Sequence, residues 1–151
     1  VGLNEKKLIK DLFETMYSFK GIGLAAVQIG ILKRVIVVDV SSNKEKKNPI
    51  SLINPVITKL STQTTVYEEG CLSIPDTFLE IERPKICEVE YIDILGKVKI
   101  LKCDGLLSTC IQHEINHLDG KLIIDHLSKL KRDLIVKKIS KSKTKLDRVV
   151  V

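Results

Sequence analysis

A five-residue run with the sequence HEINH, residues 113–117, constrains this chain more than any other segment. If the run is helical, His113 and His117 lie four residues apart on one face, and both imidazoles can reach a single metal ion while Glu114 points beside it. The same spacing also arises by chance. The run alone therefore leaves open a pair of hydrogen-bonded histidines in a protein core.

The flanking sequence predicts that this run lies in a helix from about Gly105 to Leu118. Asp104 is a good N-cap residue, Gly120 is a good residue to follow the helix, and apolar residues recur between them. This apolar stripe indicates that the two histidines face a largely buried environment.

A catalytic metal bound by this run needs a third protein ligand, which metalloproteases place downstream. One protease group has a third histidine where this chain has Ile123, and another uses a later glutamate, whereas no glutamate follows Glu114. The sequence therefore disfavours a metalloprotease. The remaining candidate ligands are the four cysteines and three later residues, Asp119, Asp125 and His126.

Cys71 differs from the other cysteines in its setting. Gly70 before it permits a sharp turn and Pro75 after it fixes one, so its thiol is open to oxidation unless something binds it. An ordinary surface thiol is the alternative. Cys110, one helical turn before His113, is better placed to line a pocket beside the metal, and the other two cysteines fall in strand-like segments that favour buried thiols.

A third segment, residues 21–28 with the sequence GIGLAAVQ, opens with glycines and ends in an amide side chain. It is not a dinucleotide-binding fingerprint, because a third glycine and a preceding strand are both missing. On its own it indicates only a tight connection into a strand from Arg34 to Val40.

Together, these segments resemble the signature motifs of the peptide deformylase family. Residues 21–28 resemble its Gly-x-Gly-Leu-Ala-Ala-x-Gln motif, residues 69–73 its Glu-Gly-Cys-Leu-Ser motif, and residues 112–120 its Gln-His-Glu-x-Asp-His-Leu-x-Gly motif. The resemblance extends between the motifs and covers nearly all of the chain.

The resemblance implies a metal-dependent hydrolase that removes the N-formyl group from the formyl-methionine of nascent polypeptides and releases formate. The three metal ligands would be Cys71, His113 and His117. Metal-bound water would be the nucleophile, and Glu114 would act as general base and then as general acid. The side-chain amide of Gln28 and the backbone N–H of Leu72 would stabilise the negative charge on the formyl oxygen.

By the same resemblance, N-formylmethionyl peptides would place the methionine side chain in an apolar pocket and pair their backbone like an added strand. Four residues would contribute to the pocket: Ile22, Leu106, Thr109 and Cys110. Backbone groups of Ile22, Gly23 and Gly70 would hold the peptide, and Arg83 would contact it.

The family points to one Fe²⁺ ion per chain. A Cys-His-His set also suits Zn²⁺, and Ni²⁺ or Co²⁺ would bind too. Because ferrous iron with a thiolate ligand is expected to be oxygen-sensitive, Zn²⁺ or Ni²⁺ can replace it in a purified sample.

Two features depart from the family pattern. Asn116 stands where the family usually has Asp, so we expect an uncharged hydrogen-bonding group, with altered local stability rather than lost chemistry. The chain opens at Val1, a few residues before a helix predicted from about Asn4 to Ser18, and we expect that an N-terminal segment of the family is missing.

Length and composition fit one domain, residues 1–151: 44% of residues are hydrophobic, and neither a linker nor a repeat divides the chain. After the strand at residues 34–40 we expect further strands up to Lys85 and a hairpin of residues 85–94 and 97–103. This predicts an α+β fold in which antiparallel β-sheets surround a central metal-binding helix that carries His-Glu-x-x-His, with a further helix at the C-terminus.

No apolar stretch reaches the roughly 18 residues of a membrane span, and no signal-peptide pattern opens the chain. We therefore expect no membrane contact and a bacterial-type cytoplasmic location, with an organelle as the alternative. In such a compartment, four cysteines indicate a metal ligand plus free thiols rather than disulfides.

The basic residues concentrate in a helix predicted at about residues 128–145, where Asp133 is the single acid. An apolar stripe of four residues would place the lysines on the outer face: Leu130, Leu134, Ile135 and Ile139. This face is either merely solvated or contacts ribosomal RNA through its phosphates. A small RNA-binding protein with a structural metal therefore stays a rival to the hydrolase, and formate release from a formylated peptide separates the two.

Overall fold

The structure, a computed structural model, describes residues 1–42 and 46–149, apart from the side chains of residues 143–149. Its helices and strands follow one another along the chain as α1 (Leu3–Ser18), β1 (Gly23–Ala25), the 3₁₀-helix η1 (Ala26–Ile29), β2 (Val35–Val38), β3 (Ile50–Leu60), β4 (Thr64–Cys71), β5 (Ile74–Pro84), β6 (Ile86–Ile92), β7 (Val98–Asp104), α2 (Gly105–Leu118), the 3₁₀-helix η2 (Ile123–His126) and α3 (Lys129–Val149).

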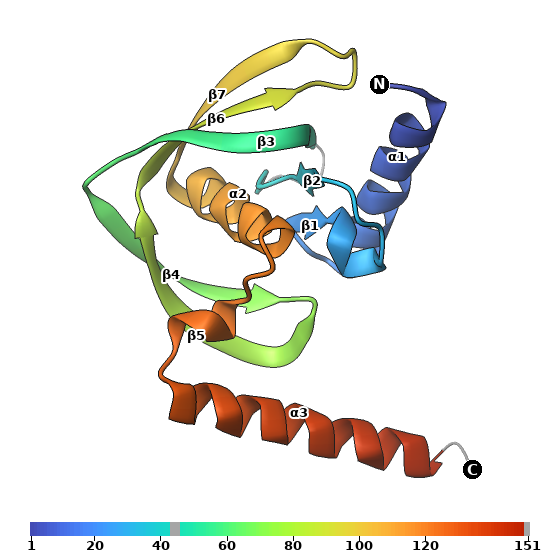
Figure 1. The fold of residues 1–151 in the computed structure, drawn as a ribbon, viewed down its shortest axis with the longest axis vertical. Helices are drawn as coiled ribbons and strands as arrows, with labels where there is room; N and C mark the ends of the chain where they lie inside the picture. Colours follow the sequence, from blue (N-terminus) through green and yellow to red (C-terminus); the bar gives the residue numbers. More distant parts are fainter. Residues whose placement is uncertain (43–45, 150–151) are drawn as a thin grey trace.

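The strands form two antiparallel sheets, one of five strands in the order β1-β2-β3-β6-β7 and one of the two strands β4 and β5. Figure 1 shows α2 between the five-stranded sheet and the β4–β5 hairpin, with α1 beside β1 and β2. The predicted α+β fold, with antiparallel sheets around a central helix, is therefore confirmed.

Strand β2 lies between two clusters of buried side chains. Val35 and Val37 pack in a cluster with α1, whereas Ile36 and Val38 pack in a cluster with α2. Since both faces of the strand are covered, every position is apolar instead of every second one. This strand holds α1 and α2 on opposite faces of the larger sheet.

Helix α2 begins and ends where its sequence predicts. The Asp104 carboxylate accepts a hydrogen bond from the Gly105 N–H at 2.6 Å. At the other end Gly120 takes a φ of 73°, and its N–H donates to the His117 carbonyl while the Lys121 N–H donates to the Asn116 carbonyl. This pairing is a Schellman motif, which needs a left-handed residue at the glycine position.

Two predicted segments differ from the structure. The predicted strand 34–40 is shorter, and the loop expected in residues 21–28 contains β1, which pairs antiparallel with β2. A three-residue edge strand followed at once by a 3₁₀ turn has too few residues for an alternating pattern, so the sequence gives no signal for it.

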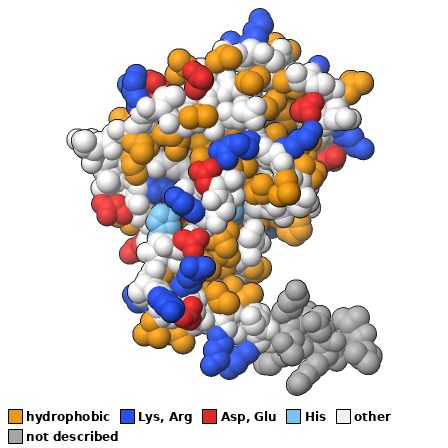
Figure 2. Space-filling view, viewed as in Figure 1, with side chains coloured by type: hydrophobic (Ala, Val, Ile, Leu, Met, Phe, Trp, Pro, Cys, Tyr) orange, Lys and Arg blue, Asp and Glu red, His pale blue; other side chains and the backbone are white. Residues whose placement is uncertain are grey.

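The C-terminal helix α3 is longer than predicted, and its apolar stripe is only partly covered. Ile135 and Ile139 pack against the cluster that contains Ile123 and Ile124. Leu130 and Leu134 are exposed, and Figure 2 shows open hydrophobic side chains where α3 begins, beside basic ones. Among the described residues, no helix is long and apolar enough to span a membrane.

Candidate active site

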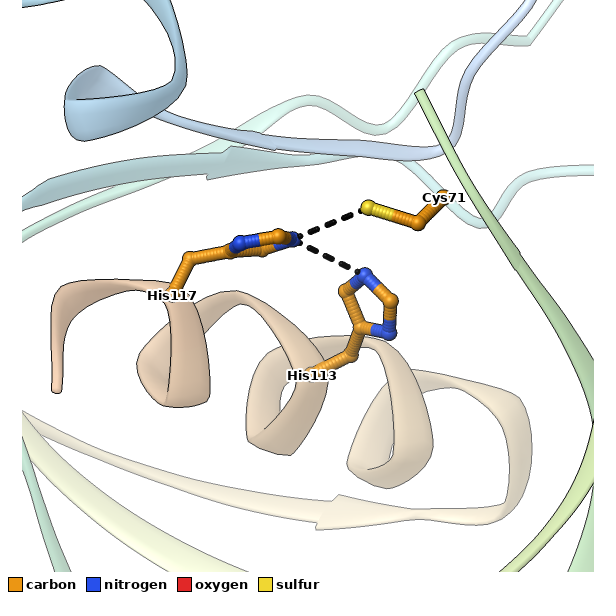
Figure 3. A group of neighbouring side chains, drawn as sticks. All are labelled: Cys71, His113 and His117. Atoms are coloured by element: carbon orange, nitrogen blue, oxygen red, sulfur yellow. Dashed lines mark hydrogen bonds between the residues drawn. The ribbon is translucent and has the colours of Figure 1, made fainter. Parts of the chain in front are cut away.

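The three predicted metal ligands converge from two elements, as Figure 3 shows. His113 and His117 come from successive turns of α2, and Cys71 comes from the end of β4. The His117 Nε2 atom lies 3.2 Å from both the Cys71 Sγ atom and the His113 Nε2 atom. All three donor atoms lie within 4.8 Å of one another.

This donor set fits a single tetrahedral metal ion. With metal–nitrogen bonds of about 2.0 Å and metal–sulfur bonds of about 2.3 Å, donor atoms on one ion lie about 3.3–3.6 Å apart. Burial raises the pKa of Cys71, but hydrogen bonding to His113 and His117 outweighs it and lowers that pKa to about 5, which favours the thiolate that a metal needs. Three protein ligands leave one coordination position for water or substrate.

Glu69 fixes the orientation of the His113 ring through the Nδ1 atom of the ring. Its Oε1 atom lies 2.8 Å from the His113 Nδ1 atom, so the ring donates its Nδ1–H there and keeps the Nε2 lone pair for a metal. Burial raises the pKa of Glu69, but hydrogen bonds from His113 and Arg83 outweigh it and lower that pKa. Glu69 therefore stays a carboxylate.

Arg83 takes part in this support rather than in peptide contact. Its guanidinium is buried, donates to both oxygens of Glu69 at 2.7 and 3.0 Å, and donates to the Asn116 Oδ1 atom at 2.7 Å. It does not line the cavity beside the predicted ligands, so the structure does not bring it to the predicted peptide site. Asn116 supplies an uncharged acceptor at this position.

A cavity of about 690 Å³ opens beside the ligands. Apart from Arg83 and His117, every predicted site residue lines it: Ile22, Gly23, Gln28, Gly70, Cys71, Leu72, Leu106, Thr109, Cys110, His113 and Glu114. The lining also includes three aromatic residues without a predicted role: Phe19, Tyr67 and Phe78. Phe78 pairs across the hairpin with Gly70, whose missing side chain makes room for the ring.

Glu114 faces this cavity as a buried carboxylate. It is 4% exposed, and its Oε2 atom has no hydrogen-bond partner among the described residues. Burial raises the pKa of Glu114 to about 7, although nearby His113 and His117 lower it. A carboxylate with such a pKa can both accept and release a proton near neutral pH.

Gln28 reaches the site from η1 in a fixed orientation. Its Oε1 atom accepts a hydrogen bond from the Ala25 N–H at 2.9 Å, so the amide nitrogen must point the other way. This nitrogen donates to the Ser73 hydroxyl at 3.0 Å and lies 3.9 Å from the Cys71 sulfur. Leu72 lies between Cys71 and Ser73 in the turn that joins β4 to β5, at the cavity wall.

Sequence reasoning gave no role to Glu69 or Ser73. Both lie inside the EGCLS segment, two residues on either side of Cys71. Their closeness to Cys71 could have indicated a supporting role, because a metal ligand needs neighbouring groups that orient it.

Comparison with known proteins agrees with this geometry. The family model described as polypeptide deformylase matches residues 2–133. The peptide deformylase of Pelagibacter ubique is 56% identical over 151 residues, which cover 100% of this chain and 87% of that protein. The one of Rhizobium meliloti is 51% identical, over 91% of this chain and 79% of that protein.

Solved structures give the same result. The crystal structure of peptide deformylase from Ehrlichia chaffeensis has a TM-score of 0.90 and 40% identity, and the match covers 96% of this chain and 86% of that one. Its complex with actinonin has a TM-score of 0.86 at 40% identity, over 93% and 84% of the two chains. This chain therefore belongs to the peptide deformylase family.

Proposed function

We propose that Cys71, His113 and His117 hold the metal ion with which this enzyme removes the formyl group from the formyl-methionine of nascent polypeptides. One observation carries the assignment of these residues. Their donor atoms lie within 4.8 Å of one another, and two of the three residues, Cys71 and His113, line the same cavity as Glu114, whose Oε2 atom has no hydrogen-bond partner among the described residues.

A metal ion held by Cys71, His113 and His117 would lower the pKa of a water molecule toward neutrality and polarise the formyl carbonyl. Glu114 accepts the proton of the attacking water and then passes it to the amine that leaves. Its pKa of about 7 suits both steps, because an acid–base group works best when its pKa lies near the working pH.

Gln28 and Leu72 stabilise the charge on the formyl oxygen. The Gln28 amide nitrogen and the Leu72 backbone N–H donate hydrogen bonds to that oxygen as negative charge develops. Because the Ala25 N–H fixes the side-chain carbonyl of Gln28, its NH₂ group already points toward the Cys71 turn before substrate binds. Such a preorganised donor needs no rearrangement during the reaction.

The cavity supplies the substrate site. Ile22, Leu106 and Cys110 give it an apolar region for the methionine side chain. Gly23 and Gly70 also line the cavity, and because they have no side chain, the substrate can approach their backbone closely. Relatives from Ehrlichia chaffeensis and Synechococcus elongatus have been crystallised with actinonin, and we infer that actinonin binds in this cavity too.

Members of this family are metalloenzymes, and we propose Fe²⁺ as the native ion here. A thiolate and two imidazoles accept Fe²⁺, Zn²⁺ and Ni²⁺, so availability and oxygen exposure decide which ion is found. Metal analysis of protein purified without oxygen should find iron, and the same protein purified in air should lose iron together with activity.

Formate release tests the function directly. Protein reconstituted with Fe²⁺ under argon should release formate from formyl-Met-Ala-Ser, and no formate should appear with acetyl-Met-Ala-Ser. Cleavage of an internal peptide bond without formate release would instead support a metalloprotease. Binding of RNA with no hydrolysis at all would support the RNA-binding alternative.

A contact with ribosomal RNA is the second part of the proposal. Helix α3 carries exposed lysines, among them Lys137, Lys138 and Lys141, while Ile135 and Ile139 attach the helix to the body. Lysines presented on one helix can bind RNA phosphates near the exit of nascent chains, and this would place the enzyme in the cytoplasm with the ribosomes.

Three exposed lysines of α3 changed to glutamine test this contact without removing its apolar anchors: Lys137→Gln, Lys138→Gln and Lys141→Gln. We expect weaker co-sedimentation with ribosomes and a smaller dependence of binding on salt. The matched control changes three exposed lysines of α1: Lys6→Gln, Lys7→Gln and Lys10→Gln. Equal binding by both triple variants would contradict the contact.

A further inference from the structure

Thr109 is a buried polar residue to which the proposed chemistry gives no task. It is 3% exposed and lines the cavity, and its hydroxyl oxygen has no hydrogen-bond partner among the described residues. A helical threonine can bond to the carbonyl three or four residues earlier, but this hydroxyl does not. A buried hydroxyl without a partner is costly, so its place in a cavity wall indicates a partner that arrives with the substrate.

The position of Thr109 relative to the reacting group suits the methionine side chain. Thr109 precedes His113 by four residues on α2, so the two lie on one face about 6 Å apart along the helix axis. In formyl-methionine, five bonds separate the formyl carbon from the thioether sulfur, an extended span of about 6 Å with ordinary bond lengths. With the formyl group at the predicted metal ligands, a methionine side chain that runs along α2 toward the N-terminus of the helix is long enough to bring the sulfur to the level of Thr109.

The other three residues assigned to the methionine pocket offer no strong competing donor. Ile22 and Leu106 have apolar side chains, and the Cys110 thiol points its weak donor at the Ile22 carbonyl oxygen, 3.5 Å away. Of the described residues assigned to the methionine pocket, Thr109 alone has an uncommitted side-chain donor.

We propose that the Thr109 hydroxyl donates a hydrogen bond to the thioether sulfur of the substrate's N-terminal methionine and so selects methionine over an apolar side chain of equal length. The inference rests on the proposed function, since it requires the methionine side chain in this cavity. A thioether is a weak acceptor, but an apolar analogue leaves the buried hydroxyl unpaired, and this adds to the discrimination.

Norleucine tests the proposal because it replaces the sulfur of methionine with a methylene group. We expect wild-type enzyme to favour formyl-Met-Ala-Ser over formyl-norleucyl-Ala-Ser by about three- to tenfold in kcat/KM, the range of one modest hydrogen bond. Thr109→Val keeps the shape and removes the donor, so the ratio should fall to about one. Thr109→Ser restores a hydroxyl and should recover most of the preference.

Ser108→Ala is the matched control. Its hydroxyl is also buried on α2, but it contacts the Pro84 carbonyl and the Gln112 amide, away from the methionine pocket. The ratio of the two substrates should not change in this variant. A wild-type ratio near one, or a preference that persists in Thr109→Val, overturns the proposal, and the latter would mean that cavity shape or a bound water selects methionine.

A binding measurement separates this inference from the proposed function. Calorimetric Kd values for the product peptides Met-Ala-Ser and norleucyl-Ala-Ser should show the same preference and the same loss in Thr109→Val. If no formyl peptide yields formate, the proposed function fails, while the two Kd values still decide whether Thr109 recognises the sulfur.

Discussion

Glu114 is held where a proton acceptor is required because α2 places it beside the two ligand histidines but turned toward the cavity. Glu114→Gln keeps the shape of the side chain and removes its basicity. We expect kcat/KM for formyl-Met-Ala-Ser to fall by about 10²–10⁴. Metal content measured by mass spectrometry should stay the same, because Glu114 is not a ligand. Loss of the metal, or full activity, would contradict this role.

Gly23 lets the backbone of β1 approach the carboxylate of Glu114. A side-chain carbon added at Gly23 would lie 2.5 Å from the Glu114 Oε1 atom and 2.8 Å from the Cys110 sulfur. Gly23→Ala should therefore displace Glu114, lower kcat/KM by about 10²-fold and destabilise the fold by about 1–3 kcal/mol. Kinetics and urea unfolding measure the two effects.

Gly2→Ala is the control for this change, since the nearest atom there is the flexible carboxylate of Glu5 at 3.2 Å. It should leave kcat/KM unchanged and lower stability by about 0.5–1 kcal/mol, because Gly2 is the N-cap of α1 and alanine is a poorer N-cap residue. Equal losses of activity in the Gly23 and Gly2 variants would argue against a close approach at Gly23.

At single residues, the sequence predicts ligands better than the groups that support them. His113 and His117 are local, because helical spacing alone puts them on one face. The bond between Arg83 and Glu69 joins two strands through side chains that face α2, and no local pattern says which of several charged residues will pair. For this reason the sequence predicted Arg83 at the peptide, whereas the structure places it against Glu69, the residue that contacts the predicted ligand His113.

Among the elements, α1 is tied to the segment after β2 by a hydrogen bond that depends on pH. The Tyr17 hydroxyl donates to the Asp39 carboxylate at 2.5 Å, and the Lys47 ammonium lies over the Tyr17 ring. Burial and the hydrogen bond to Asp39 raise the pKa of Tyr17 to about 12. The phenol must stay neutral to donate this bond.

Because the folded pKa of Tyr17 lies above the ordinary value of 10, its contribution to stability is complete below pH 10 and is lost as the pH rises toward 12. Tyr17→Phe should cost about 1.5–3 kcal/mol at pH 8, the range for a hydrogen bond to a charged group. Urea unfolding from pH 8 to 11.5 should show the difference between wild type and variant shrinking above pH 10. A difference that does not vary with pH would rule out this linkage.

Elements with strong local signals were predicted closely, and those that depend on distant partners were not. The β6–β7 hairpin follows from alternating residues around Gly96, which takes a φ of 79° in the turn. Strand β1 exists because β2 offers it an edge, and Leu130 and Leu134 are exposed although Ile135 and Ile139 of the same helix pack against the body. Neither the pairing of β1 nor the exposure of these leucines can be predicted from the sequence of the segment alone.

Across the whole molecule, the proposed metal site would add a further link between two parts that already share hydrogen bonds, from Arg83 to Asn116 and between Glu69 and His113. Strands β4 and β5 form a sheet of their own, and α2 lies between this hairpin and the five-stranded sheet. A two-stranded hairpin is marginally stable alone, so it depends on what attaches it. Under the proposed assignment, Cys71 at the end of β4 and the two histidines of α2 would provide one such attachment through a shared ion.

Removal of the metal should therefore loosen the β4–β5 hairpin more than the larger sheet. At a metal concentration 1,000 times the Kd, binding stabilises the folded state by about 4 kcal/mol, so chelation should lower the Tm. In hydrogen exchange with chelator, amides of β4 and β5 should exchange faster, whereas those of β2, buried on both faces, should keep their protection. Cys71→Ser should exchange like the chelated wild type with or without added metal. Faster exchange spread evenly over both sheets would mean that the ion stabilises the whole fold rather than attaching the hairpin to it.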